Sequence, residues 1–202
     1  MISAYVRDIA NTALAAYASQ TPWYLTTNAP DIVRELMKAC GDGYALHGDA
    51  MIHRSAIIEP GAQLKGPALI GPNCLVASSA LLRGGCFLDH DCILGPGVEL
   101  KSSFLFAGSK AAHLNFIGDS VIGADVNIEA GAMIANYRNE RAEKRIRIAA
   151  ADGVIDTGVD KFGALVGDSV RIGANAVIAP GALLKPETIV ARLALIDQAS
   201  GV

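Results

Sequence analysis

The chain has 202 residues, of which 51% are apolar and 18% are charged, and its formal net charge is −3. This composition is typical of a folded protein and excludes a disordered chain, while the weak charge without long runs of one sign argues against a nucleic-acid partner. No apolar stretch reaches the roughly 18 residues of a membrane span, and the N-terminus lacks the pattern of a signal peptide, so we expect a cytoplasmic protein without membrane segments.

The segment 1–46 differs from the rest of the chain and predicts a short N-terminal helical cap. An alanine-rich stretch from Ser3 to Ser19 is expected to form its first helix. Asn28 is expected to cap a second helix, with Pro30 in its first turn and Gly41 after its end. We expect these helices to cover the open end of the following domain, because the end of a solenoid must not stay bare. A binding role is the alternative.

From Ile52 onward, a large apolar residue recurs at every sixth position, and the residue four places later is mostly small. The large residues are Ile52, Ile58, Leu64, Ile70, Val76, Leu82, Leu88, Leu94, Leu100 and Phe106. The small positions hold Ala56, Ala62, Ala68, Cys74, Ala80, Cys86, Cys92, Val98 and Phe104. The phase reappears in later runs that contain Ile122, Ile128, Ile134, Val166, Ile172, Ile178, Leu184 and Val190.

This hexapeptide repeat predicts an all-β solenoid, a left-handed parallel β-helix over residues 47–192 with a tail at 193–202. Each short strand needs one inward anchor beside a small corner residue, and three strands close a triangular coil of about 18 residues that stacks on the next. A β-sandwich would show two-residue alternation instead. The left hand is known for this repeat class and does not follow from the periodicity.

The four cysteines form no CxxC pair, so we expect no metal site. Three of them, Cys74, Cys86 and Cys92, occupy small corner positions and are predicted to be structural.

The six-residue phase fails twice, and function is expected where it fails. The first break predicts a loop over residues 107–117, and the second predicts a charged, protruding arm over residues 138–162. Asp152-Gly153 lies between apolar residues and indicates a hairpin turn within the arm.

The loop contains His113, and a histidine beside a rigid scaffold can act as a general base. A lone loop histidine is more often solvated or structural, and His90 is a competing candidate.

The residues from Gly108 to Tyr137 resemble a known family through the segments GSKAAHLNFIGDS, IGADVNIEAG and ANY. They are similar to the acetyltransferase domain of the bifunctional glucosamine-1-phosphate N-acetyltransferase/N-acetylglucosamine-1-phosphate uridylyltransferase family, and to stand-alone hexapeptide-repeat proteins of the sugar-phosphate nucleotidyltransferase-like type. The resemblance is continuous from about Arg83 to Tyr137 and resumes weakly from Gly163.

The resemblance implies an acyltransferase that moves an acetyl group from acetyl-CoA to an amino-sugar phosphate such as glucosamine-1-phosphate, without a metal. It implies a homotrimer with sites between neighbouring subunits. His113 falls on the catalytic base. The implied substrate-binding residues are Arg83, Lys101, Phe116 and Asn127. The implied acetyl-CoA-binding residues are Ala130, Asn136, Tyr137 and Ala174.

Two residues depart from the family pattern. Phe116 stands where the family has a tyrosine, and Ala142 meets a family lysine that Lys144 or Arg141 could replace. Because residues 1–46 are too short for a nucleotide-binding domain, we expect no uridylyltransferase activity.

Two other functions stay open from the sequence. A non-catalytic scaffold or regulatory partner could keep the sugar-phosphate or CoA binding without the reaction. A carbonic-anhydrase-like zinc site would need converging histidines, but His53, His90 and His113 are far apart along the solenoid.

A homotrimer is also predicted by an outward row that is too apolar for solvent. We assign to one face Leu69, Leu75, Leu81, Phe87, Ile93 and Leu105.

Overall fold

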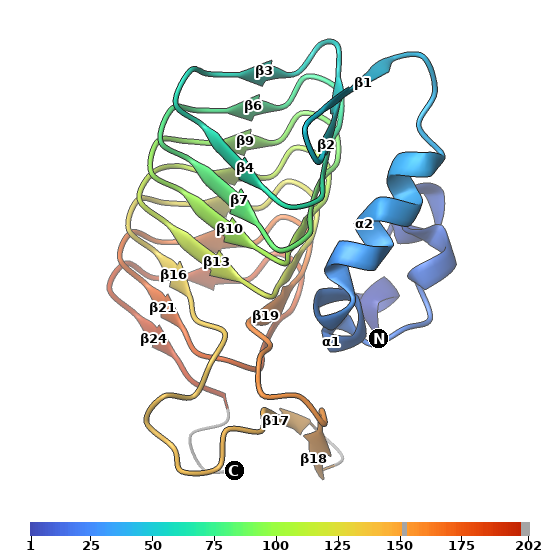
Figure 1. Cartoon of the computed structure of the whole chain (residues 1–202). Helices are drawn as coiled ribbons and strands as arrows, with labels where there is room; N and C mark the ends of the chain where they lie inside the picture. Colours follow the sequence, from blue (N-terminus) through green and yellow to red (C-terminus); the bar gives the residue numbers. More distant parts are fainter. Residues whose placement is uncertain (151–152, 199–202) are drawn as a thin grey trace.

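The computed structural model describes residues 1–150 and 153–198 and is a left-handed parallel β-helix, which confirms the predicted fold class (Figure 1). Three sheets form its sides, here called A, B and C, and each coil passes through them in that order. We call the turns between them the A–B, B–C and C–A corners.

Sheet A contains β1 (Tyr44–His47), β2 (Ala50–His53), β5 (Ala68–Ile70), β8 (Cys86–Leu88), β11 (Phe104–Leu105), β14 (Val121–Ile122), β19 (Ala164–Val166) and β22 (Ala182–Leu184). Sheet B contains β3 (Ile57–Ile58), β6 (Leu75–Val76), β9 (Ile93–Leu94), β12 (Lys110–Ala111), β15 (Asn127–Ile128), β20 (Arg171–Ile172) and β23 (Ile189–Val190). Sheet C contains β4 (Gln63–Lys65), β7 (Leu81–Arg83), β10 (Glu99–Lys101), β13 (Phe116–Gly118), β16 (Met133–Ile134), β21 (Val177–Ile178) and β24 (Leu195–Ile196). All neighbours in these sheets are parallel except β1 and β2.

The core is a set of vertical columns of inward side chains. In sheet A, for example, the parallel register stacks Ile70, Leu88, Leu105 and Ile122 one above another, and each is almost fully buried. Burial of each such side chain stabilises the fold by roughly 1.5–3 kcal/mol. The predicted corner role of the three cysteines is confirmed, because Cys74, Cys86 and Cys92 are free and buried in this core.

Inward residues on successive sheets are normally six residues apart. Wherever a described coil departs from this spacing, the change lies at the C–A corner. Leu105 follows Leu100 by five residues, and Ile122 follows Ile117 by five. In the next coil the whole arm is inserted between Ile134 and the following strand of sheet A. The other two corners keep the step of six, so the strands remain in register while one corner changes.

This placement corrects two expectations. The predicted loop 107–117 is wrong, because its residues form β12 and β13 of a regular coil. Phe106 is not the tenth inward anchor. The shortened corner moves Leu105 into the core, and Phe106 packs in the cluster under the N-terminal segment instead.

The N-terminal segment has two α-helices, α1 (Pro22–Thr27) and α2 (Ala29–Lys38). The second begins after Asn28 and has Pro30 in its first turn, as predicted. The predicted helix from Ser3 to Ser19 is wrong. Three short 3₁₀ turns replace it, at Ile2–Ala4, Ile9–Asn11 and Ala15–Tyr17. Hydrogen bonds of the Thr12 hydroxyl to backbone groups at Ile9 and Leu14 favour a turn over a continuous helix.

These turns and helices lie along sheet A, not over the open end of the solenoid as expected (Figure 1). They cover a row of outward side chains on sheet A, all at most 4% exposed. The row contains Leu69, Phe87, Phe104, Phe106, Val121 and Leu165. The open end stays partly bare, with a cavity of about 540 Å³ lined by Ile52, Ile58 and Leu64.

The apolar face predicted for the trimer is therefore not one face. Side chains on one sheet recur once per coil, so residues six apart lie on different sheets. Leu69 and Phe87 belong to sheet A, Leu75 and Ile93 to sheet B, and Leu81 to sheet C, while Leu105 points inward. The fully apolar row on sheet A is covered by the chain itself.

The arm contains the predicted hairpin, formed by β17 (Arg147–Ala150) and β18 (Gly153–Asp156). The expected turn residue Asp152 lies outside the described residues. The arm does not simply protrude, because Ile146 and Ile148 are buried in the cluster beneath the N-terminal segment.

The solenoid also extends further than expected. Strand β24 pairs with β21, so residues 193–196 belong to the last coil and not to a tail. Within residues 1–150 and 153–198, no helix has the length and apolar character needed to cross a bilayer.

A matched pair of leucines tests the cover over sheet A. Leu69→Ala removes a side chain that is 4% exposed beneath the N-terminal segment, and we expect it to lower the free energy of unfolding by roughly 2–4 kcal/mol. Leu46→Ala, on β1 at the edge of sheet A and 62% exposed, should change it by less than about 0.5 kcal/mol. Denaturant unfolding measures both, and equal losses would contradict the assigned cover.

Candidate functional site

His113 lies at the B–C corner, between β12 and β13, and its side chain is exposed. Its backbone is held in the solenoid, because its carbonyl accepts a hydrogen bond from the Gly131 N–H at 3.0 Å. Within the described part of the chain, the imidazole hydrogen-bonds to no other residue. His113 therefore stands on a rigid corner with a ring open to a ligand.

The predicted backbone positions Ala130 and Ala174 lie at the same corner in the next two coils. Asn175 N–H donates to the Ala130 carbonyl at 3.0 Å, which continues the ladder below His113. Beside them, Arg192 donates to both carboxylate oxygens of Glu129 at 2.8 and 2.9 Å, and these hydrogen bonds lower the pKa of Glu129. The B–C corner thus has small residues in a column beside an ion pair.

Arg83 and Lys101 lie on the other edge of sheet C, in adjacent coils. Each cation is paired with a carboxylate that was not predicted from the sequence. Two guanidinium nitrogens of Arg83 lie 2.6 and 2.7 Å from Oε1 of Glu99. Nζ of Lys101 lies 2.7 and 2.8 Å from the two carboxylate oxygens of Asp119. A phosphate that binds here would have to share both cations with these carboxylates.

Phe116 and Asn136 converge on the glycine between them. A Cβ atom on Gly118 would lie 2.8 Å from Cγ of Asn136 and 2.8 Å from Cε1 of Phe116. The side-chain amide of Asn136 donates to Asp119, which also holds Lys101. Glycine at this position therefore allows the aromatic ring and the amide to meet at the C–A corner.

A cavity of about 490 Å³ opens at this corner, and two segments outside the solenoid form part of its wall. Lys101 and Asp119 line it from the solenoid, Thr27 and Pro30 from the helices, and Lys161 from the arm.

The stretch after Asn136 is anchored by Arg138. Its guanidinium donates to both oxygens of Asp197 at 2.7 and 2.9 Å and to the Pro180 carbonyl at 2.8 Å, and its side chain is only 4% exposed. Lys144 folds back, with Nζ 5.3 Å from the ring centroid of Tyr137 and bonded to the Asn139 carbonyl at 2.9 Å. These contacts hold the ring of Tyr137 and the chain that follows it.

A single chain brings together only part of the predicted site. Arg83, Lys101, Phe116 and Asn136 cluster at or near the C–A edge of sheet C, and Tyr137 follows them. His113, Ala130 and Ala174 form a column on the opposite edge, and β13 spans the sheet between the two groups. Asn127 lies on sheet B, paired with Lys110 and Arg171, and so on a different face.

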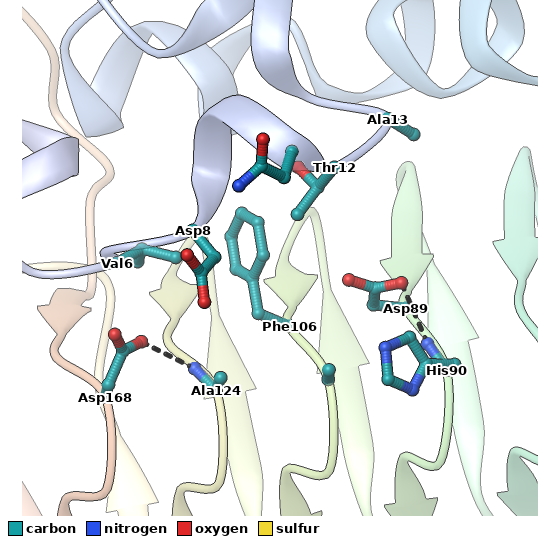
Figure 2. A pocket seen from close by; sticks show the side chains of 11 residues that line it. Val6, Asp8, Thr12, Ala13, Asp89, His90, Phe106, Ala124 and Asp168 are labelled. Carbon is teal, nitrogen blue, oxygen red and sulfur yellow. Dashed lines mark hydrogen bonds between the residues drawn. The ribbon is translucent and has the colours of Figure 1, made fainter.

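The competing histidine, His90, lies at the A–B corner and lines a second pocket of about 480 Å³ (Figure 2). The pocket lies under the N-terminal turns, with Phe106 at its base and Asp8 and Asp168 on one side. His90 Nδ1 is 2.8 Å from a carboxylate oxygen of Asp91, and this hydrogen bond raises the pKa of His90. Its ring is thus committed to a neighbour, unlike that of His113.

The zinc alternative gains no support from the arrangement of the histidines. His53 packs against Tyr44 near the open end, while His90 and His113 lie at different corners. Within the described ranges, no three His, Cys, Asp or Glu side chains gather in a metal-binding group.

The chain is similar in sequence to bifunctional sugar-phosphate enzymes. A bifunctional sugar-1-phosphate nucleotidylyltransferase/acetyltransferase from Sulfurisphaera tokodaii is 44% identical over 88 residues, which is 44% of this chain and 21% of that protein. The bifunctional protein GlmU of Methanococcus maripaludis is 29% identical over 181 residues, 88% of this chain and 43% of the relative. The chain therefore spans less than half the length of these relatives. No protein-family model matches the chain.

Among solved structures, the polysialic acid O-acetyltransferase OatWY aligns with a TM-score of 0.44 and 18% identity, over 70% of this chain and 74% of that one. The acetyltransferase domain of PglB from Neisseria gonorrhoeae aligns with a TM-score of 0.36 and 16% identity, over 89% and 74%. The resemblance stated from residues 108–137 is confirmed by the curated relatives.

Two arginines of the arm test how the stretch after Asn136 is anchored. Arg138→Met removes a nearly buried guanidinium that binds Asp197 and the Pro180 carbonyl, and we expect it to lower the free energy of unfolding by roughly 3 kcal/mol. Arg145→Met breaks the exposed ion pair with Asp156 and should cost less than about 1 kcal/mol. Thermal or denaturant unfolding compares them, and an equally small loss in both variants would contradict the anchoring role.

Proposed function

We propose that the protein transfers an acetyl group from acetyl-CoA to the amine of an amino-sugar phosphate such as glucosamine-1-phosphate, with His113 as the general base. The observation that carries the proposal is the exposed His113 on a rigid corner, above the small residues Ala130 and Ala174 in successive coils. The similarity to the sugar-1-phosphate nucleotidylyltransferase/acetyltransferase of Sulfurisphaera tokodaii supports the reaction class.

The chemistry suits these residues. An amine that attacks a thioester must lose a proton, and a neutral imidazole near pH 7 can accept it as the carbon–nitrogen bond forms. The tetrahedral intermediate then collapses, the carbon–sulfur bond breaks, and coenzyme A leaves as a thiolate that takes the proton back from the imidazolium of His113. The column of small residues below His113 leaves room for the extended arm of the donor.

The phosphate of the acceptor would bind at Arg83 and Lys101. The guanidinium of Arg83 has five N–H donors, and Glu99 engages only part of this fork, so a phosphate can bind alongside it. Asn136 and Tyr137 are proposed donor-binding residues, and Asn127 and Phe116 are proposed acceptor-binding residues.

A homotrimer with sites between subunits would bring the scattered residues together. Asn127 faces outward on sheet B, while Phe116 faces outward on sheet C, so one chain cannot place both on one ligand. Sheets B and C also keep exposed apolar side chains, including Ile57, Ile189, Met133 and Leu195. Sheet A is covered by the chain itself, which leaves B and C as the proposed contact faces.

A non-catalytic sugar-phosphate or CoA-binding scaffold is the second candidate. The pairing of Lys101 with Asp119 and of Arg83 with Glu99 favours it, because both cations are already partly neutralised. Phe116 also lacks a hydroxyl that could bind a sugar. Release of coenzyme A thiol in the presence of an amino-sugar phosphate separates the enzyme from the scaffold.

The general base is tested by His113→Ala. We expect kcat for acetyl transfer to fall by roughly 10²–10⁴-fold, the usual range for a lost general base, with little change in KM. The free energy of unfolding should hardly change, because the side chain is exposed.

His90→Ala is the matched control, because its ring lies at another corner and is held by Asp91. Turnover should be nearly unchanged. Equal activity in both variants would refute the assignment of the base, and loss of assembly in His113→Ala would instead indicate a structural residue.

The assembly is tested by light scattering of the purified protein at micromolar concentration. We expect the mass of three chains. A stable monomer that still transfers acetyl groups would contradict sites shared between subunits.

A further inference from the structure

The carboxylate of Asp119 joins two residues that the proposed function assigns to different substrates. It accepts hydrogen bonds from Nζ of Lys101 at 2.7 and 2.8 Å and from the side-chain amide of Asn136. Lys101 belongs to the acceptor half of the proposed site, and Asn136 to the donor half. One nearly buried carboxylate, 7% exposed, therefore connects the two halves.

The backbone holds Asp119 on both sides. Its N–H donates to the Lys101 carbonyl at 2.8 Å, and its carbonyl accepts from the Gly163 N–H at 2.9 Å, where the chain returns from the arm. Its φ angle of +44° lies in the left-handed region, which aspartate adopts more readily than most residues. Because the backbone is fixed, the carboxylate can follow a partner that moves only by rotation about its two side-chain torsions.

The charges make the two partners interdependent. A phosphate at Lys101 shares the ammonium group with Asp119 and weakens that ion pair. A nearly buried carboxylate that loses part of one donor depends more strongly on its remaining donor. That donor is the amide of Asn136, whose orientation is thereby fixed when the acceptor is bound.

We propose that Asp119 is a positioning residue that couples binding of the sugar phosphate at Lys101 to the orientation of Asn136 toward acetyl-CoA. The inference rests on the proposed function and adds a residue to it. Asp119 acts only through its two partners and contacts neither substrate.

A double-mutant cycle tests the coupling. We measure kcat/KM for transfer from acetyl-CoA to glucosamine-1-phosphate in K101A, N136A and the double variant, in the wild-type and D119N backgrounds. In the wild-type background the effects should be non-additive by roughly threefold to a hundredfold, the usual range for coupled residues. In the D119N background they should be additive.

The control background is E99Q, which removes the partner of Arg83 on the same sheet without touching Asn136. Non-additivity should persist there. Additive effects in the wild-type background, or undiminished coupling in D119N, would overturn the inference and leave the proposed function intact. A wild-type protein that transfers no acetyl group would overturn both.

Since D119N removes a nearly buried ion pair, a second measurement avoids this variant. Calorimetry gives the Kd of coenzyme A, which cannot donate an acetyl group and so does not react, with and without saturating glucosamine-1-phosphate. We expect a shift of several-fold in the wild type and none in N136A. A wild-type Kd that does not change would reject the coupling, even if both ligands bind.

Discussion

The register between stacked coils is the constraint on which the rest of this structure depends. Each inward side chain must lie above its equivalent in the coil below, as Leu88 does between Ile70 and Leu105. A change in length at any corner would normally carry every later strand out of register. The described coils avoid this by placing each change at the C–A corner, where the chain between sheets C and A is shortened twice and then extended by the arm.

That arrangement gathers the side chains of Lys101, Asp119 and Asn136 at one edge of the solenoid. The two shortened corners contain Ser102 and Asp119 with positive φ angles, and the arm begins just after Asn136. The outer face of sheet A has a structural role instead, because the N-terminal segment covers its apolar row and removes it from solvent. Sheets B and C are the faces that we propose for ligands and partner chains, and His113 lies on the edge that they share.

The solenoid could be predicted well from the sequence because the six-residue repeat is a local pattern, and the nine anchors from Ile52 to Leu100 follow it without a break. The position of the phase break was predicted wrongly. The repeat already shortens to five residues at Ser102 and Ser103, but Phe106 still fits the six-residue spacing although it packs outward. Leu69 and Leu75 were also predicted to share one face, although only residues one coil apart do so.

The carboxylates Glu99 and Asp119 were missed because their pairing with Arg83 and Lys101 depends on stacking across 16 and 18 residues. Basic residues recur one coil apart at Lys65, Arg83 and Lys101. This column of positive charge is the sequence signal that could have indicated nearby carboxylates.

A crystal structure with coenzyme A and glucosamine-1-phosphate tests the account most directly. The account predicts the phosphate within hydrogen-bonding distance of Lys101 or Arg83, the sugar amine facing an imidazole of His113, and the pantetheine along the corner at Ala130 and Ala174. Ligands bound instead in the pocket beside His90, or on a face remote from His113, would contradict it.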